Sequence, residues 1–170
     1  MNQADSPVVS YAESPAALLA AHYRTVWQRG EPDMAEINPA LDVESLGFAR
    51  HAGDWFGVVI TPWFLRLYLL PGGGTLWGEI PAGQRRFLEL PGGTLPFVAA
   101  REEELGTYQF STLITPMSLV PDMAAARQIA VDALQAFIFG MPSAVPPSPP
   151  AAPAPDTSRR GFFRRLAGKR

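Results

Sequence analysis

Apolar residues recur at helical spacing in two stretches of the chain, and each stretch is bounded by helix-ending signals. The first begins at Ser14-Pro15, because serine is a favourable N-cap and proline suits the first helical position; it ends near Arg29-Gly30. Its apolar face carries Leu18, Leu19, His22, Val26 and Trp27. The second stretch is Asp122–Phe139, which Pro121 precedes and Gly140 ends. The pattern therefore predicts two amphipathic helices.

Between these helices the apolar runs are short and are interrupted by glycine and proline. The segment 41–60 predicts a hairpin with its turn near Ala52–Asp54, and Phe64–Leu70 predicts a third strand. Further strands are expected at Arg85–Leu90, Pro96–Glu103 and Tyr108–Ile114. Turns about every 8–12 residues favour an antiparallel arrangement over βαβ units. The expected fold class is α+β, with a meander-like antiparallel sheet of five or six strands covered by an N-terminal and a C-terminal helix.

The composition divides the chain into four parts. Residues 1–13 predict a flexible N-terminus, and residues 14–141 the α+β domain. Residues 142–157 hold seven of the 18 prolines, a composition typical of an extended, semi-rigid linker. Residues 158–170 form a basic tail.

Length and composition exclude several classes of site. With 170 residues, 47% of them hydrophobic, the chain is large enough for one domain with a substantial core. Zero cysteine excludes disulfides, thiolate metal sites and a cysteine nucleophile, and two histidines leave little for a histidine metal site. We therefore expect no metal and no cofactor. The chain start lacks the apolar run of a secretory signal, and the longest apolar stretch, Val58–Leu70, is shorter than the ~20 residues of a spanning helix. The expected location is the cytoplasm.

Charge is distributed unevenly along the chain. Residues 1–156 carry all 16 acidic residues and eight arginines, a formal net charge of −8, whereas residues 157–170 carry six basic residues. An acidic domain argues against nucleic acid as a partner, because contact with phosphates requires a basic surface.

No group of residues in the sequence predicts catalysis. The run Glu102-Glu103-Glu104 is typical of a solvated face. Gly72-Gly73-Gly74 follows a proline and indicates a turn rather than a phosphate loop, and His51 is expected to be exposed at a hairpin tip. No serine or threonine stands in a nucleophile elbow. We therefore expect that the protein is not an enzyme and has no catalytic residues.

Two Thr-Pro pairs stand at the ends of predicted strands, Thr61-Pro62 and Thr115-Pro116. Proline lacks the N–H that a strand ladder needs, so both pairs should mark strand ends or edges. The large apolar residues that follow them either pack in the core or border one groove formed by Trp63, Phe64, Met117 and Leu119. Tryptophan supplies anchoring area and methionine adapts its shape, which suits a surface that binds a polypeptide. The candidate partner-binding residues are Thr61, Pro62, Trp63, Phe64, Thr115, Pro116, Met117 and Leu119.

The basic tail contains a second candidate motif. Residues 158–164, Ser-Arg-Arg-Gly-Phe-Phe-Arg, are close to a twin-arginine export signature. Because no hydrophobic stretch follows, we expect that the motif does not direct export of its own chain. Three roles stay open: a solubilising tail, an anchor making weak contact with a membrane surface, and a mimic of a signal that a client carries. The candidate residues are Arg159, Arg160, Phe162 and Phe163.

Three segments resemble the HybE/HupJ family of [NiFe]-hydrogenase assembly chaperones. They are Asn38-Pro39-Ala40-Leu41-x-Val43-Glu44-x-x-Gly47-Phe48; Gly57-Val58-Val59-Ile60-Thr61-Pro62-Trp63-Phe64-Leu65-x-Leu67-x-Leu69-Leu70-Pro71-Gly72; and Leu105-Gly106-x-Tyr108-Gln109-x-Ser111-Thr112-Leu113-Ile114-Thr115-Pro116-Met117. The resemblance covers roughly Leu18–Phe139. Thr115 stands where the family usually has serine, and the rubredoxin-like extension of some relatives is excluded here by the lack of cysteine.

The resemblance implies a non-catalytic maturation factor that binds hydrogenase structural subunits before assembly and export. The resemblance favours the small-subunit precursor, which carries an N-terminal twin-arginine signal, as the client. The large subunit stays open as a second client. Two other classes stay open as well. One is a membrane-surface or protein-interaction adaptor that acts through the tail, and the other is a metal- or cofactor-handling enzyme of the same pathway.

Overall fold

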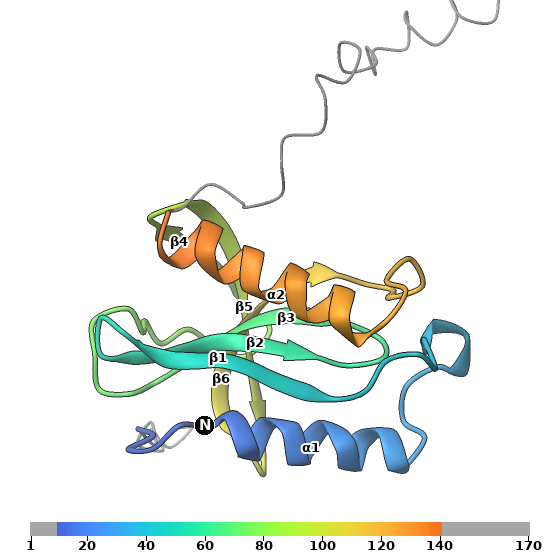
Figure 1. The fold of residues 1–170 in the computed structure, drawn as a ribbon. Helices are drawn as coiled ribbons and strands as arrows, with labels where there is room; N and C mark the ends of the chain where they lie inside the picture. Colours follow the sequence, from blue (N-terminus) through green and yellow to red (C-terminus); the bar gives the residue numbers. More distant parts are fainter. Residues whose placement is uncertain (1–9, 141–170) are drawn as a thin grey trace, which may run out of the picture.

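A six-stranded antiparallel sheet is the middle layer of the computed structural model, which describes residues 10–140 (Figure 1). α1 (Ala16–Gln28) lies on one face of the sheet and α2 (Met123–Ile138) on the other. A short 3₁₀ turn, η1 (Met34–Glu36), follows α1. The predicted α+β class, with its N-terminal and C-terminal helices, is confirmed. The predicted linker, the basic tail and residues 1–9 of the predicted flexible N-terminus lie outside the described residues. No helix within residues 10–140 is long and apolar enough to cross a membrane.

The sheet is built from two three-stranded meanders. Its strands are β1 (Glu44–His51), β2 (Asp54–Ile60), β3 (Leu65–Leu70), β4 (Arg85–Leu90), β5 (Gly93–Glu102) and β6 (Gly106–Ile114). Their order is β1-β2-β3-β6-β5-β4. The chain therefore leaves β3, crosses to the far edge and returns, so that β6 rather than β4 pairs with β3. The expected antiparallel hairpins form, but the simple meander is interrupted at this crossover.

The first hairpin has the turn that its sequence predicts. His51 pairs with Asp54, which leaves Ala52 and Gly53 as a two-residue loop, with φ of 50° and 86° respectively. Two central residues with positive φ are typical of a type I′ turn, whose twist matches that of the flanking strands. Glycine adopts this conformation without the steric cost of a Cβ atom.

Buried apolar residues form two clusters, one on each face of the sheet. In β3 the side chains of Leu65, Leu67 and Leu69 pack on the α2 side, whereas Tyr68 and Leu70 pack on the α1 side. This alternation follows from the two-residue period of a strand. Because β3 is central and has a core on both faces, it has the nearly continuous apolar sequence typical of such strands.

α1 buries a face that differs in part from the predicted one. Leu19 is fully buried, and Val26 and Trp27 pack against the same cluster, as the spacing predicts. Leu18 is instead exposed, and the buried positions include Ala20 and Tyr23. The buried face thus runs through Leu19 and Tyr23, four residues apart, which matches the period of one helical turn.

Candidate partner-binding site

The two Thr-Pro corners lie side by side in the structure. Thr61 directly follows β2 and Thr115 directly follows β6, so both pairs mark strand ends as predicted. Leu65 of β3 pairs with Ile114 of β6, and the Thr115 hydroxyl donates a hydrogen bond to the Trp63 carbonyl at 3.1 Å. The crossover topology is what joins segments 52 residues apart in the sequence.

Asn38 ties both corners to a third segment. Its backbone N–H donates to the Pro62 carbonyl at 2.8 Å. Its side-chain amide donates to the carbonyls of Met117 at 3.0 Å and Val120 at 2.7 Å. We call this unit, residues 38, 61–64 and 115–120, the corner junction.

Thr61 and Pro62 are buried and shape the first corner from within. The Thr61 hydroxyl oxygen accepts the backbone N–H groups of Trp63 at 3.2 Å and Phe64 at 2.9 Å. A threonine that bonds to the backbone two and three residues on holds a tight turn. Thr61 and Pro62 therefore stabilise the corner from inside. Their contact with a partner remains a prediction.

The apolar side chains of the two corners do not form the single groove that was one of two predicted arrangements. Phe64 is 3% exposed and lies in the α1-side cluster, 5.2 Å from the Tyr23 ring, whereas Met117 is fully buried in the α2-side cluster. The sheet separates them. Trp63 is partly buried, and Leu119 is 93% exposed. The exposed residues of the corner junction are instead Thr115, Pro116, Ser118 and Leu119, and Asn38 and Trp63 are partly exposed.

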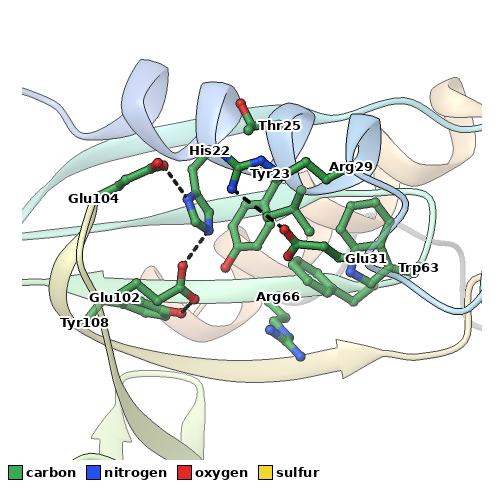
Figure 2. A pocket seen from close by; sticks show the side chains of 12 residues that line it. His22, Tyr23, Thr25, Arg29, Glu31, Trp63, Arg66, Glu102, Glu104 and Tyr108 are labelled. Carbon is green, nitrogen blue, oxygen red and sulfur yellow. Dashed lines mark hydrogen bonds and ion pairs between the residues drawn. The ribbon is translucent and has the colours of Figure 1, made fainter.

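A pocket of about 330 Å³ opens beside Trp63, between α1 and the sheet (Figure 2). Three elements or segments line it: α1 with the residues that follow it, the first corner with β3, and the end of β5 with β6. The lining residues are His22, Tyr23, Thr25, Val26, Arg29, Glu31, Trp63, Phe64, Arg66, Glu102, Glu104 and Tyr108. Two of the predicted binding residues, Trp63 and Phe64, thus belong to it.

One end of the pocket is acidic. The His22 ring lies between two carboxylates, with Nε2 2.5 Å from Glu102 and Nδ1 3.1 Å from Glu104 (Figure 2). The Tyr108 hydroxyl donates to the second oxygen of Glu102 at 2.6 Å. The His22 side chain is 11% exposed, whereas Glu102 and Glu104 are 37% and 54% exposed. The solvated face predicted for this glutamate run therefore holds only in part, because two of its members contact α1.

The other end of the pocket is aromatic. The rings of Trp63 and Phe64 pack edge to face at 5.6 Å. The Arg66 guanidinium lies 3.9 Å from the centre of the Phe64 ring and 4.3 Å from that of Phe110, which is cation–π geometry. Its Nε donates to the Thr112 hydroxyl at 3.0 Å, so this arginine is held against the sheet.

Two tyrosines of the pocket wall, Tyr23 and Tyr108, pack against a third, Tyr68, which lies behind them. The hydroxyls of Tyr23 and Tyr68 are 2.6 Å apart, and burial raises the pKa of Tyr23, Tyr68 and Tyr108 above the ordinary value. These phenols therefore stay neutral and serve as hydrogen-bonding groups. Within residues 10–140, no set of three or more His, Cys, Asp or Glu side chains is placed to hold a metal ion.

The pocket was not found from the sequence, although part of its signal was present. Glu102 and Glu104 alternate, so both can project toward the same side as the strand ends. His22 carries a polar ring on the predicted apolar face of the first helix, which was a second signal. Neither pattern reveals that residues 82 positions apart meet, because this depends on the strand order.

Comparison with known proteins gives a consistent result. A family model described as "[NiFe]-hydrogenase assembly, chaperone, HybE" matches residues 14–165. The chain is 36% identical over 151 residues to Protein HoxT of Cupriavidus necator; this alignment covers 81% of this chain and 82% of HoxT. It is 33% identical over 105 residues to the probable rubredoxin HupJ of Rhodobacter capsulatus, a match that spans 62% of this chain but only 38% of that relative. The solution structure of HybE from Escherichia coli matches with a TM-score of 0.63 and 26% identity, over 86% of this chain and 90% of that one.

Proposed function

Because the chain belongs to the HybE family of [NiFe]-hydrogenase assembly chaperones, we propose that it binds the small-subunit precursor of a [NiFe] hydrogenase before assembly and export. Family membership supports a role in hydrogenase assembly. The small subunit as client, the twin-arginine signal as the recognised feature, and the cytoplasm as the place of binding are the further content of the proposal.

The observation that carries the proposal is the exposed side of the corner junction, which is continuous with the pocket through Trp63. Leu119 is almost fully exposed and lies, with the exposed Ser118, between the buried residues Met117 and Val120. An apolar side chain held outward by buried residues on both sides is positioned for contact with another protein. Trp63 belongs both to the corner junction and to the pocket wall, so one client segment can touch both features.

The contacts inside the pocket favour binding over catalysis. Both ring nitrogens of His22 face carboxylates, and the Tyr108 hydroxyl donates to Glu102. These polar groups thus bond to one another. Among the hydrogen bonds of residues 10–140, no serine or threonine hydroxyl is paired with a histidine or a carboxylate, the pairing that activates such a nucleophile.

Co-purification of the tagged full chain with the small-subunit precursor tests the proposal. The double variant Trp63→Ala/Leu119→Ser removes both apolar contacts and should retain at least tenfold less precursor. A tenfold loss of affinity corresponds to about 1.4 kcal/mol of binding free energy. Phe87→Ser is the matched control, because Phe87 is a large apolar residue, 68% exposed, on β4.

Circular dichroism confirms that each variant is folded before its binding is compared. Retention of the precursor at the wild-type level by a folded double variant would refute the proposed surface. Retention of the large subunit alone would refute the proposed client.

A further inference from the structure

The pocket offers a different chemistry at each of its two ends. Its acidic end presents Glu102 and Glu104, and its aromatic end presents Trp63 and Phe64; Figure 2 shows Glu104 and Trp63 at opposite sides. Glu104 contacts His22 through one oxygen only and is 54% exposed. Because a carboxylate offers about four acceptor positions, the acidic end has capacity for further donors.

This combination fits a ligand that carries arginine close to an aromatic residue. A guanidinium presents five N–H donors in a planar fork, which matches carboxylates better than an ammonium group does. A phenyl ring next to it would pack edge to face on Trp63, as Phe64 already does. The two arginines that line the pocket make contacts elsewhere than at Glu102 and Glu104: Arg66 stacks on Phe64, and Arg29 lies 3.8 Å from Glu31.

We propose that residues 158–165 of this chain, Ser-Arg-Arg-Gly-Phe-Phe-Arg-Arg, occupy the pocket when no client is bound. Arg159 and Arg160 would bind the carboxylates of the acidic end, and Phe162 or Phe163 would pack against the aromatic end. This segment lies outside the described residues, so the proposal depends on its sequence and on the pocket that the structure describes.

Charge supports this occupant. Residues 10–140 contain 14 acidic residues and eight arginines, a formal net charge of −6, and residues 157–170 carry +6. A segment that neutralises the domain and matches the two ends of the pocket has both long-range attraction and local fit.

Chain length also permits this occupant. The Gly92 N–H donates to the Phe137 carbonyl at 3.2 Å, so α2 ends against the β4–β5 turn. β5 then runs from Gly93 at that turn to Glu102 at the pocket, a path of about 30 Å at ~3.3 Å per residue. The 20 residues from Gly140 to Arg160 span up to about 65 Å when extended. This length covers the path even with a detour around the β4 edge.

Tethering makes a weak contact sufficient. A short tether gives an effective concentration on the order of 1 mM, so a segment that binds in trans with a Kd of about 0.1 mM would fill roughly nine pockets in ten. A client with a similar Arg-Arg-x-Phe motif must then displace the tail. Only this competition depends on the proposed function; occupancy of the pocket by the tail does not.

Disulfide trapping in the full chain tests the proposal, and the absence of native cysteine makes the readout clean. Glu103→Cys places a thiol beside the acidic end at an exposed position, and Gly161→Cys places the other in the tail. The control combines Gly161→Cys with Glu89→Cys, an exposed β4 position nearer to the point where α2 ends. An undocked tail would therefore react faster with the control thiol.

We expect the pocket pair to form an intramolecular disulfide at least tenfold faster than the control pair. Adding Glu102→Gln/Glu104→Gln, or raising salt to ~1 M, should lower the rate to that of the control, because both changes weaken the charge attraction. A pocket pair no faster than the control, or bonds mainly between two copies, would overturn the proposal. The proposal would also be overturned if the pocket pair formed its disulfide at the control rate and the full chain co-sedimented with anionic vesicles. That result would assign the tail to membrane surfaces.

The same variants separate this proposal from the proposed function. Fast trapping in a chain that retains no precursor would leave pocket occupancy standing and remove the client. Slow trapping in a chain that retains precursor would remove the proposed occupancy of the pocket by the tail and leave the proposed client standing. If both proposals hold, Arg159→Ala/Arg160→Ala should tighten precursor binding several-fold, since the competing segment is weakened.

Discussion

Met117 and Leu119 are two residues apart but should respond to truncation in opposite ways. Met117 is fully buried in the α2-side cluster, whereas Leu119 is 93% exposed. We therefore expect Met117→Ala to destabilise the fold strongly, and Leu119→Ala to leave stability nearly unchanged.

The magnitude follows from the atoms removed. Met117→Ala deletes three buried heavy atoms, which amounts to about 2 kcal/mol at ~0.8 kcal/mol for each buried methylene-sized group. The cavity left behind raises the loss to about 3 kcal/mol, within the range known for buried methionine truncations. For a domain of this size the melting temperature should fall by about 10 °C. Leu119→Ala should change stability by less than about 0.5 kcal/mol.

Urea unfolding of the two full-length variants, followed by circular dichroism, measures the difference. The slope of the free energy with denaturant should match that of the wild type, so that the shift in midpoint reports stability alone. Equal midpoints for Met117→Ala and Leu119→Ala would refute the assignment of Met117 to the core. The same result would support the sequence-based prediction that Met117 lies on the partner-binding surface.

Two further substitutions test the framework around the site. Asn38→Ala removes two side-chain hydrogen bonds to the carbonyls of Met117 and Val120 and should cost about 1–3 kcal/mol in the same urea assay; a loss below about 0.5 kcal/mol would contradict its role in the corner junction. Burial tends to raise the pKa of Asp54, but backbone hydrogen bonds, led by those from Gly72 and Trp77, outweigh it and hold the pKa below its ordinary value. The stability that this carboxylate contributes is therefore full above its unfolded pKa of ~3.9 and is lost as pH falls through the folded value, so Asp54→Asn should be less stable at pH 7 yet lose less stability than the wild type between pH 5 and pH 3. Parallel pH profiles for both proteins would show that this carboxylate contributes nothing to the acid dependence.

Local signals in the sequence were sufficient for the type and order of the elements, although β5 begins at Gly93 rather than Pro96 and β6 at Gly106 rather than Tyr108. Asp122 caps α2 by accepting the Ala125 N–H, and β4 spans the predicted Arg85–Leu90. The N-cap of α1 is Pro15, without a side-chain capping bond, rather than the predicted Ser14. Turn residues fix hairpins because they act over two to four positions. The α+β class follows from the same information.

The strand order and the pocket depend on contacts between distant residues, which local patterns do not encode. The pairing of β3 with β6 brings Thr115 to Trp63, and the end of β5 reaches α1 so that Glu102 meets His22. Apolar type alone also fails to distinguish Met117 from Leu119, because a methionine suits a core as well as a binding surface. Their separation follows from which side of the chain faces the sheet.

Binding of the purified full chain to two forms of the small subunit tests the central proposal most directly. One form is the complete precursor, and the other lacks its N-terminal signal. We expect the complete precursor to bind at least tenfold more tightly, and the advantage to disappear in Glu102→Gln/Glu104→Gln. Equal affinity for both forms, or no affinity for either, would contradict the account.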